Sequence, residues 1–155
     1  RMPLRFHRLE LWADSGGPGF HRGGQGYEAT TEWLGEQSTA TLRRERMRFA
    51  PPGLLGGDPA PLCRTRFEPR DAEARDLPGK IDITMSGGDV LHYWTTGGAG
   101  RDSPLTRDPQ RVFADVLDER VSVASACERY GVVVNAGKFD AAATATLRQR
   151  LATPT

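Results

Sequence analysis

Two glycine-rich segments contain the residues of this sequence that are best suited to chemistry. Residues 14–26 hold six glycines in thirteen positions, together with His21 and Arg22, and residues 97–100 hold three glycines in four. Glycine lets another backbone or a ligand approach closely, and consecutive backbone N–H groups can form a nest for an anion. Arg22 adds a fixed cation that suits a carboxylate or a phosphate.

Other side chains give little support for catalysis. The three histidines, His7, His21 and His92, lie in separate segments without the spacing of metal ligands. Ser15 precedes two glycines, but no partner base is identifiable, so we interpret it as a turn serine. The sequence contains no nucleophile elbow, P-loop or paired-carboxylate pattern. We therefore expect no catalytic residue and no metal site in this chain.

Composition excludes several classes of partner. The 21 basic and 20 acidic side chains leave a net charge of +1, so no overall field favours nucleic acid. No apolar run approaches the roughly 20 residues that a membrane span needs. Cys63 and Cys127 have no metal-ligand spacing and are interpreted as free thiols of a cytoplasmic protein, with a bridge between them left as an alternative.

Hydrophobic alternation predicts a mainly β domain over residues 1–100, built as a sandwich or a barrel-like antiparallel sheet. A slip in the phase of the first strand indicates a β-bulge at His7-Arg8. The last two strands are expected to pair as a hairpin across the Gly87-Gly88 turn. The predicted strands are residues 4–11, 27–33, 39–47, 62–67, 80–85 and 90–95.

Residues 101–155 are predicted to form a C-terminal segment of three short helices packed on the β domain, which makes the fold α+β overall. Asp108, Ser122 and Asp140 are the predicted N-caps, and Gly131 ends the second helix. A DNA-binding helix-turn-helix is disfavoured because the second helix offers only two charged groups. The residues expected to face inward are Val112, Phe113, Val116, Leu117, Val123, Cys127, Tyr130, Ala143, Leu147 and Leu151.

The basic cluster in the third predicted strand has two readings. Four arginines in six positions can contact phosphate, but such clusters are more often solvated faces paired with nearby glutamates, and we favour the solvated face. The cluster comprises Arg43, Arg44, Arg46 and Arg48.

Three motifs resemble the hydantoinase B/5-oxoprolinase family. Residues 88–109 contain GDV, a strand, TGGAG, PL and RDP, which resembles the closing segment of that family. Residues 14–26, DSGGPGFHRGGQG, resemble its DSGG-x-G-x-x-RGG-x-G segment, and residues 121–133 resemble its V-S-x-E-A-A-x-x-Y-G-V-V ending. The sequence departs from the family pattern at Thr96, Ala99 and Arg101-Asp102.

The resemblance implies a place in a two-component enzyme that uses ATP to open cyclic amides, of the N-methylhydantoinase or 5-oxoprolinase type. Family chains are several times longer, so this chain is expected to be a C-terminal fragment of the B component that is inactive when isolated. The family places ATP on a hydantoinase A-type partner subunit and a divalent metal in the N-terminal part of the B component. Two alternatives stay open: a non-catalytic subunit-assembly domain, and part of a related ATP-dependent acetone or acetophenone carboxylase.

We expect the two glycine-rich segments to emerge at the same end of the sheet, with Gly98 and Arg22 within about 20 Å, the length of a typical strand. Together they would border a substrate cavity that the rest of the B component completes. The candidate cavity-lining residues are Asp14, Ser15, Gly16, Gly17, His21, Arg22, Gly23, Gly24, Gly97, Gly98 and Gly100.

Overall fold

The computed structural model describes residues 2–152, which divide into two compact units. The first unit consists of residues 2–12, 26–50 and 62–96, and the second of residues 13–25, 51–61 and 97–152. The chain therefore enters the second unit three times. The last entry lies between Thr96 and Gly97, and the two earlier entries bring residues 13–25 and 51–61 into the second unit.

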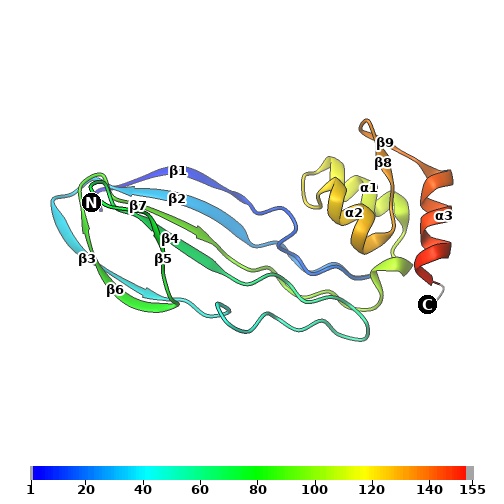
Figure 1. The fold of residues 1–155 in the computed structure, drawn as a ribbon, viewed down its shortest axis with the longest axis horizontal. Helices are drawn as coiled ribbons and strands as arrows, with labels where there is room; N and C mark the ends of the chain where they lie inside the picture. Colours follow the sequence, from blue (N-terminus) through cyan, green and yellow to red (C-terminus); the bar gives the residue numbers. More distant parts are fainter. Residues whose placement is uncertain (1, 153–155) are drawn as a thin grey trace. The chain divides into compact units, whose positions relative to one another are not determined.

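An open five-stranded antiparallel sheet forms most of the first unit (Figure 1). Its edge strands are β1 and β5, so the sheet does not close into a barrel. The pairing register of β1 and β2 shifts between Phe6 and Arg8, which confirms the predicted bulge. In spatial order the strands are β1 (Leu4–Leu11), β2 (Tyr27–Trp33), β7 (Val90–Trp94), β4 (Arg64–Glu68) and β5 (Arg75–Asp76).

The predicted hairpin between residues 80–85 and 90–95 is wrong. Strand β6 (Lys80–Ser86) pairs with β3 (Gln37–Arg43) in a separate two-stranded sheet. Strand β7 is flanked by β2 on one side and β4 on the other, so neither of its edges is left for β6. Strand β3 also ends at Arg43 rather than at the predicted Met47.

The turn between β6 and β7 directs the chain from one sheet into the other. Gly88 takes a φ of +94°, and the Asp89 N–H donates to the Ser86 carbonyl over 3.0 Å. The buried Asp89 carboxylate accepts the N–H groups of Ser86 and Arg70, at 2.7 and 2.8 Å. The predicted turn at Gly87-Gly88 is therefore present, but the strands on either side of it do not pair with each other.

Side chains from both sheets share one apolar core. Ile83 and Met85 of β6 lie in the same buried cluster as Phe67 of β4 and Leu91 of β7. A lone hairpin would leave these apolar faces in water, whereas placing β6 and β7 in different sheets lets both strands bury them.

The second unit carries the helices, as predicted. Asp108 accepts the Gln110 N–H, Ser122 accepts the Ser125 N–H and Asp140 accepts the Ala143 N–H, which confirms the three N-caps. Gly131 ends α2 with a φ of +63°. The elements are η1 (Pro104–Thr106), α1 (Pro109–Leu117), α2 (Val123–Tyr130), β8 (Val134–Asn135), β9 (Lys138–Phe139) and α3 (Ala141–Ala152).

The buried faces of the helices differ in part from the predicted stripes. Val112 and Tyr130 are buried as expected, but Leu117, Val123 and Leu151 are exposed. Because side chains four apart share a helix face, Ala126 takes the inward position of α2 beside Tyr130. Within residues 2–152, no helix combines the length and the hydropathy needed to cross a membrane.

Candidate functional site

Three glycine-rich segments of the second unit are joined backbone to backbone. The Gly17 N–H donates to the Gly98 carbonyl over 2.8 Å, and the Gly98 N–H donates to the Gly24 carbonyl over 2.9 Å. On the other side, the Gly100 N–H donates to the Asp58 carbonyl over 2.9 Å. Residues 97–100 therefore lie between residues 14–25 and residues 51–61. Because Gly98 is hydrogen-bonded to Gly24, two positions from Arg22, the prediction that Gly98 and Arg22 lie within about 20 Å is confirmed.

Close backbone approach explains most of the glycines. A Cβ on Gly23 would overlap the Gly98 carbonyl oxygen, and one on Gly17 would lie 2.6 Å from the Gly100 nitrogen. Gly16, Gly97 and Gly100 are equally crowded by backbone atoms. A side chain at any of these five positions would separate the segments, so these glycines have a packing role. We refer to the joined segments, residues 14–25, 51–61 and 97–103, as the glycine layer.

Gly24 and Gly98 differ from the other glycines of the layer. A Cβ on Gly24 would meet nothing within 4 Å, and one on Gly98 would make only ordinary contacts, at 3.5 Å or more. Both residues are exposed, and neither has a positive φ. The described structure gives no packing reason for glycine here. Since Gly98 donates to Gly24, the two form one exposed patch of backbone without side chains, which we call the glycine patch.

The other candidate side chains of residues 14–21 differ in their burial and contacts. The Asp14 carboxylate accepts the Ser122 N–H over 2.9 Å, and the Asp14 N–H donates to the Arg120 carbonyl, so Asp14 fastens the loop to the start of α2. Ser15 is completely buried and follows the turn at residues 13–14. The exposed His21 exchanges backbone hydrogen bonds with Arg101.

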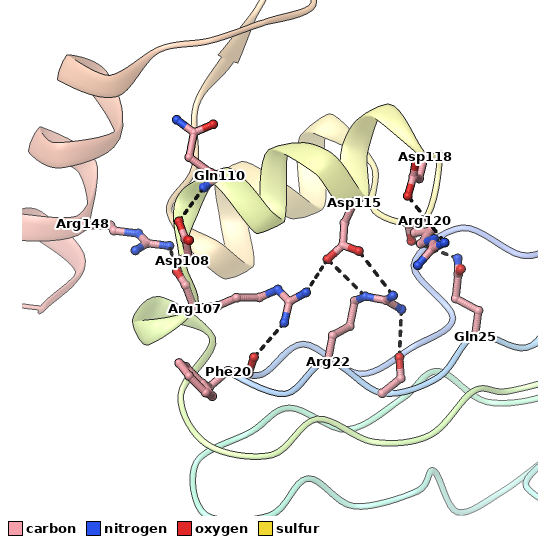
Figure 2. Close-up of polar contacts among 11 residues, drawn as sticks. Phe20, Arg22, Gln25, Arg107, Asp108, Gln110, Asp115, Asp118, Arg120 and Arg148 are labelled. Carbon is pink, nitrogen blue, oxygen red and sulfur yellow. Dashed lines mark hydrogen bonds and ion pairs between the residues drawn. The ribbon is translucent and has the colours of Figure 1, made fainter.

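Arg22 is held inside the protein by a carboxylate. Its Nε and Nη2 lie 3.4 Å from the two Asp115 oxygens, and its Nη1 donates to the Gly23 carbonyl over 2.9 Å (Figure 2). The two charged side chains are only 11% and 9% exposed. All three nitrogens of the guanidinium thus have acceptors within the protein. Contact of this cation with a ligand stays a prediction.

Asp115 also binds a second arginine, from the RDP motif. Arg107 Nη2 lies 2.9 Å from Asp115 Oδ2, and Arg107 Nη1 donates to the Phe20 carbonyl over 2.8 Å. One carboxylate on α1 therefore holds two arginines, and both arginines hold carbonyls of residues 20–23 (Figure 2). The arrangement ties the glycine layer to α1.

Tyr130 of α2 completes this cluster. It is 1% exposed, and its hydroxyl makes no hydrogen bond of ordinary geometry within residues 2–152, although the Gly19 backbone N–H lies near enough to act on its pKa. Burial raises the pKa of Tyr130 to about 12, although the Arg22 and Arg107 cations act in the opposite direction. We refer to Arg22, Arg107, Asp115 and Tyr130 as the buried arginine cluster.

The sequence singled out Arg22 of this cluster as a functional candidate and Tyr130 as a buried residue, but gave no role to Arg107 or Asp115. A signal for Asp115 was present, because it lies three residues after Val112 and next to Val116, on the apolar stripe of α1. A carboxylate on the buried face of a helix requires a cationic or hydrogen-bonding partner. The sequence did not indicate that the partner would be two arginines.

Tyr130 gives the first testable prediction. Because the folded pKa lies above the ordinary value of 10, the neutral phenol stabilises the fold below pH 10, and this contribution is lost as the pH rises from 10 towards 12. Tyr130→Phe should therefore reduce the loss of unfolding free energy in that range. At neutral pH Tyr130→Phe should not destabilise the protein, because it removes a buried hydroxyl without a hydrogen-bond partner among the described residues, and such a group costs about 1–3 kcal/mol.

Urea unfolding at neutral and alkaline pH measures this effect. Tyr27→Phe is the matched control, because that ring is 42% exposed, and it should follow the wild type. Equal alkaline losses in the wild type and Tyr130→Phe would contradict the assignment.

The described residues do not suit a metal ion. No group of three His, Cys, Asp or Glu side chains within residues 2–152 could hold one. Both cysteines are free, with Cys63 buried.

Comparison with known proteins identifies the family. The sequence model of the Hydantoinase B/oxoprolinase family matches residues 1–104 of the 155. The chain belongs to this family. The matched region contains all three segments of the glycine layer up to residue 103 and ends before α1.

Longer matches extend the similarity through the helices. The chain is 32% identical to the caprolactamase subunit beta of Pseudomonas jessenii, with 92% of the chain and 25% of that subunit covered. The crystal structure of the ATP-dependent caprolactamase from P. jessenii aligns with a TM-score of 0.84 at 30% identity, over 95% of this chain and 26% of that chain. A nucleotide-free acetone carboxylase aligns with a TM-score of 0.81 at 26% identity, over 96% and 25%. This hydantoinase B-family chain thus spans about a quarter of the length of these relatives.

Proposed function

We propose that this chain is the C-terminal domain of the B-type subunit of an ATP-dependent cyclic-amide hydrolase, and that it borders the substrate cavity without supplying catalytic groups. The glycine patch is the observation that carries this proposal. Gly24 and Gly98 have room for a side chain but carry none, and backbone free of Cβ atoms is suited to close approach by a ligand.

The buried arginine cluster supports the same role. A binding surface needs a rigid support, because small displacements of contacting groups weaken binding and slow turnover. The glycine layer is held by backbone hydrogen bonds between its segments. Asp115 of α1 also binds Arg22 of the layer and Arg107, whose side chain holds the Phe20 carbonyl. The chain thus offers a fixed wall for a cavity rather than a mobile loop.

The reacting groups belong to other parts of the proposed enzyme. We assign ATP to a hydantoinase A-type ATPase subunit and the divalent metal to the remainder of the B-type subunit, in a cytoplasmic multi-subunit enzyme. The subunit name of the P. jessenii relative supports a multi-subunit assembly. ATP dependence of both structural relatives supports the energy source.

Gly24→Ala in the complete enzyme tests the proposal. The substitution should leave the fold intact because a Cβ meets nothing within 4 Å, yet lower ATP-dependent hydrolysis of a cyclic amide by about tenfold or more. Hydrolysis of caprolactam, hydantoin and 5-oxoproline is measured together with phosphate release. Exposed Gln110 on α1, replaced by Ala, serves as a surface control and should leave turnover unchanged.

The result separates the two roles considered for this chain. Full turnover in Gly24→Ala would refute a cavity wall at the glycine patch. Loss of subunit association, measured by size-exclusion chromatography, would instead assign the patch to a subunit-assembly interface.

The likeness to acetone carboxylase favours a second candidate, an ATP-dependent ketone carboxylase. The complete enzyme would then consume acetone or acetophenone with bicarbonate and ATP, and would not open a cyclic amide. The same phosphate-release assay, run with both substrate classes, distinguishes the two reactions.

A further inference from the structure

The first unit contains a groove that is lined by charged and aromatic side chains outside the glycine layer. It has a volume of about 890 Å³ and lies between the chain after β3 and the chain before β6. Leu77 is buried within its lining. The groove is lined by Arg44, Glu45, Arg46, Met47, Arg48, Phe49, Leu77, Pro78, Gly79 and Lys80.

The lining has an excess of positive charge. Four cations face a single carboxylate, and that carboxylate, Glu45, pairs with Lys80 over 3.4 Å. Arg44 donates to the Trp94 carbonyl and lies 5.3 Å from the centre of the Tyr93 ring. The side chains of Arg46 and Arg48 are exposed and make no hydrogen bond or ion pair with the residues that the structure describes. The sequence predicted that nearby glutamates would pair with this basic cluster, but the side chains of Arg46 and Arg48 have no such partner in the described part of the chain.

A fixed turn presents the free arginines beside an exposed aromatic ring. Arg46 takes a φ of +60°, which is uncommon for a residue with a side chain, and its carbonyl accepts the Cys63 N–H over 2.9 Å. Phe49 is 79% exposed. Strained backbone occurs often at binding sites, and exposed aromatic residues next to arginine are typical of interface anchors.

We propose that this groove binds an acidic polypeptide segment, with carboxylates at Arg46 and Arg48 and an apolar side chain against Phe49. Charge complementarity identifies the occupant, since each unpaired guanidinium can receive a carboxylate in a two-point hydrogen bond. A polypeptide fits better than a small phosphate because phosphate gains nothing from Phe49. The inference stands on the groove alone and does not depend on the proposed function.

Fluorescence anisotropy of a labelled peptide tests this inference on the 155-residue chain. The probe is a short peptide in which glutamates flank one phenylalanine. Its affinity should fall at least about tenfold in Arg46→Glu/Arg48→Glu, and it should also fall in Phe49→Ala. Arg111→Glu, at an exposed position of α1, makes the same charge change as Arg48→Glu alone; it is the control for that single variant and should bind like the wild type.

Three outcomes would overturn the proposal. They are no binding of the acidic peptide to the wild type, equal binding to Arg46→Glu/Arg48→Glu, and displacement by inorganic tripolyphosphate with no effect of Phe49→Ala. The last would assign a small-anion site. Arg48→Glu alone keeps the test valid if the change at the strained Arg46 disturbs folding, which thermal melts followed by circular dichroism would reveal.

Discussion

Asp115→Ala should destabilise this protein by about 3–5 kcal/mol. The substitution leaves Arg22 and Arg107, only 11% and 15% exposed, without the carboxylate that both of them bind. An uncompensated buried charge costs far more than the net contribution of an intact ion pair. Urea unfolding followed by far-UV circular dichroism measures the loss.

Two further variants test the physical cause of this loss. Asp118→Ala removes an exposed carboxylate at the C-cap of the same helix, 3.5 Å from Arg120, and should cost less than about 1 kcal/mol. Arg22→Met added to Asp115→Ala should restore part of the stability, because one of the two unpaired cations is removed. If the double variant is as unstable as the sum of its single variants, Arg22 and Asp115 do not interact.

Gly23→Ala should destabilise the second unit by about 3 kcal/mol, in contrast to its neighbour Gly24→Ala. A Cβ at position 23 overlaps the Gly98 carbonyl oxygen, and backbone atoms cannot rotate away as a side chain can. A Cβ at position 24 meets open space. The two variants differ by one position and make the same chemical change, so each serves as a control for the other.

Tryptophan fluorescence and helical circular dichroism report on the two units separately. The tryptophans, Trp12, Trp33 and Trp94, all belong to the first unit, whereas the described helices belong to the second. Gly23→Ala should therefore lower the midpoint of the helical circular dichroism signal. Equal midpoints for Gly23→Ala and Gly24→Ala would show that the segments can separate without cost, and that the close approach does not stabilise the protein.

The sequence by itself determined most of the local structure, because local structure depends on neighbouring residues. Alternation over residues 27–33 predicted β2, and the phase slip near His7 predicted the bulge of β1. Asp108, Ser122 and Asp140 were predictable caps because their side chains bond backbone groups two or three positions away. The family was also readable, since its motifs keep their residue types and order.

Only the tertiary structure decided how the segments pair. Strands β6 and β7 are adjacent in sequence, but each pairs with strands distant in the chain, because burying both apolar faces stabilises more than closing the nearest hairpin. The tertiary structure also decided the partner of Arg22. Its charge predicted an anionic partner, and within the described residues that partner is Asp115, 93 positions away.

The glycines show which features the sequence could predict and which depended on the tertiary structure. The composition identified the glycine-rich segments as unusual, but nothing in the sequence distinguishes Gly23 from Gly24. The difference between them is the presence of the Gly98 carbonyl beside one and of solvent beside the other. That distinction depends on contacts between residues more than 70 positions apart, and such contacts are set by packing of the whole unit rather than by any local pattern.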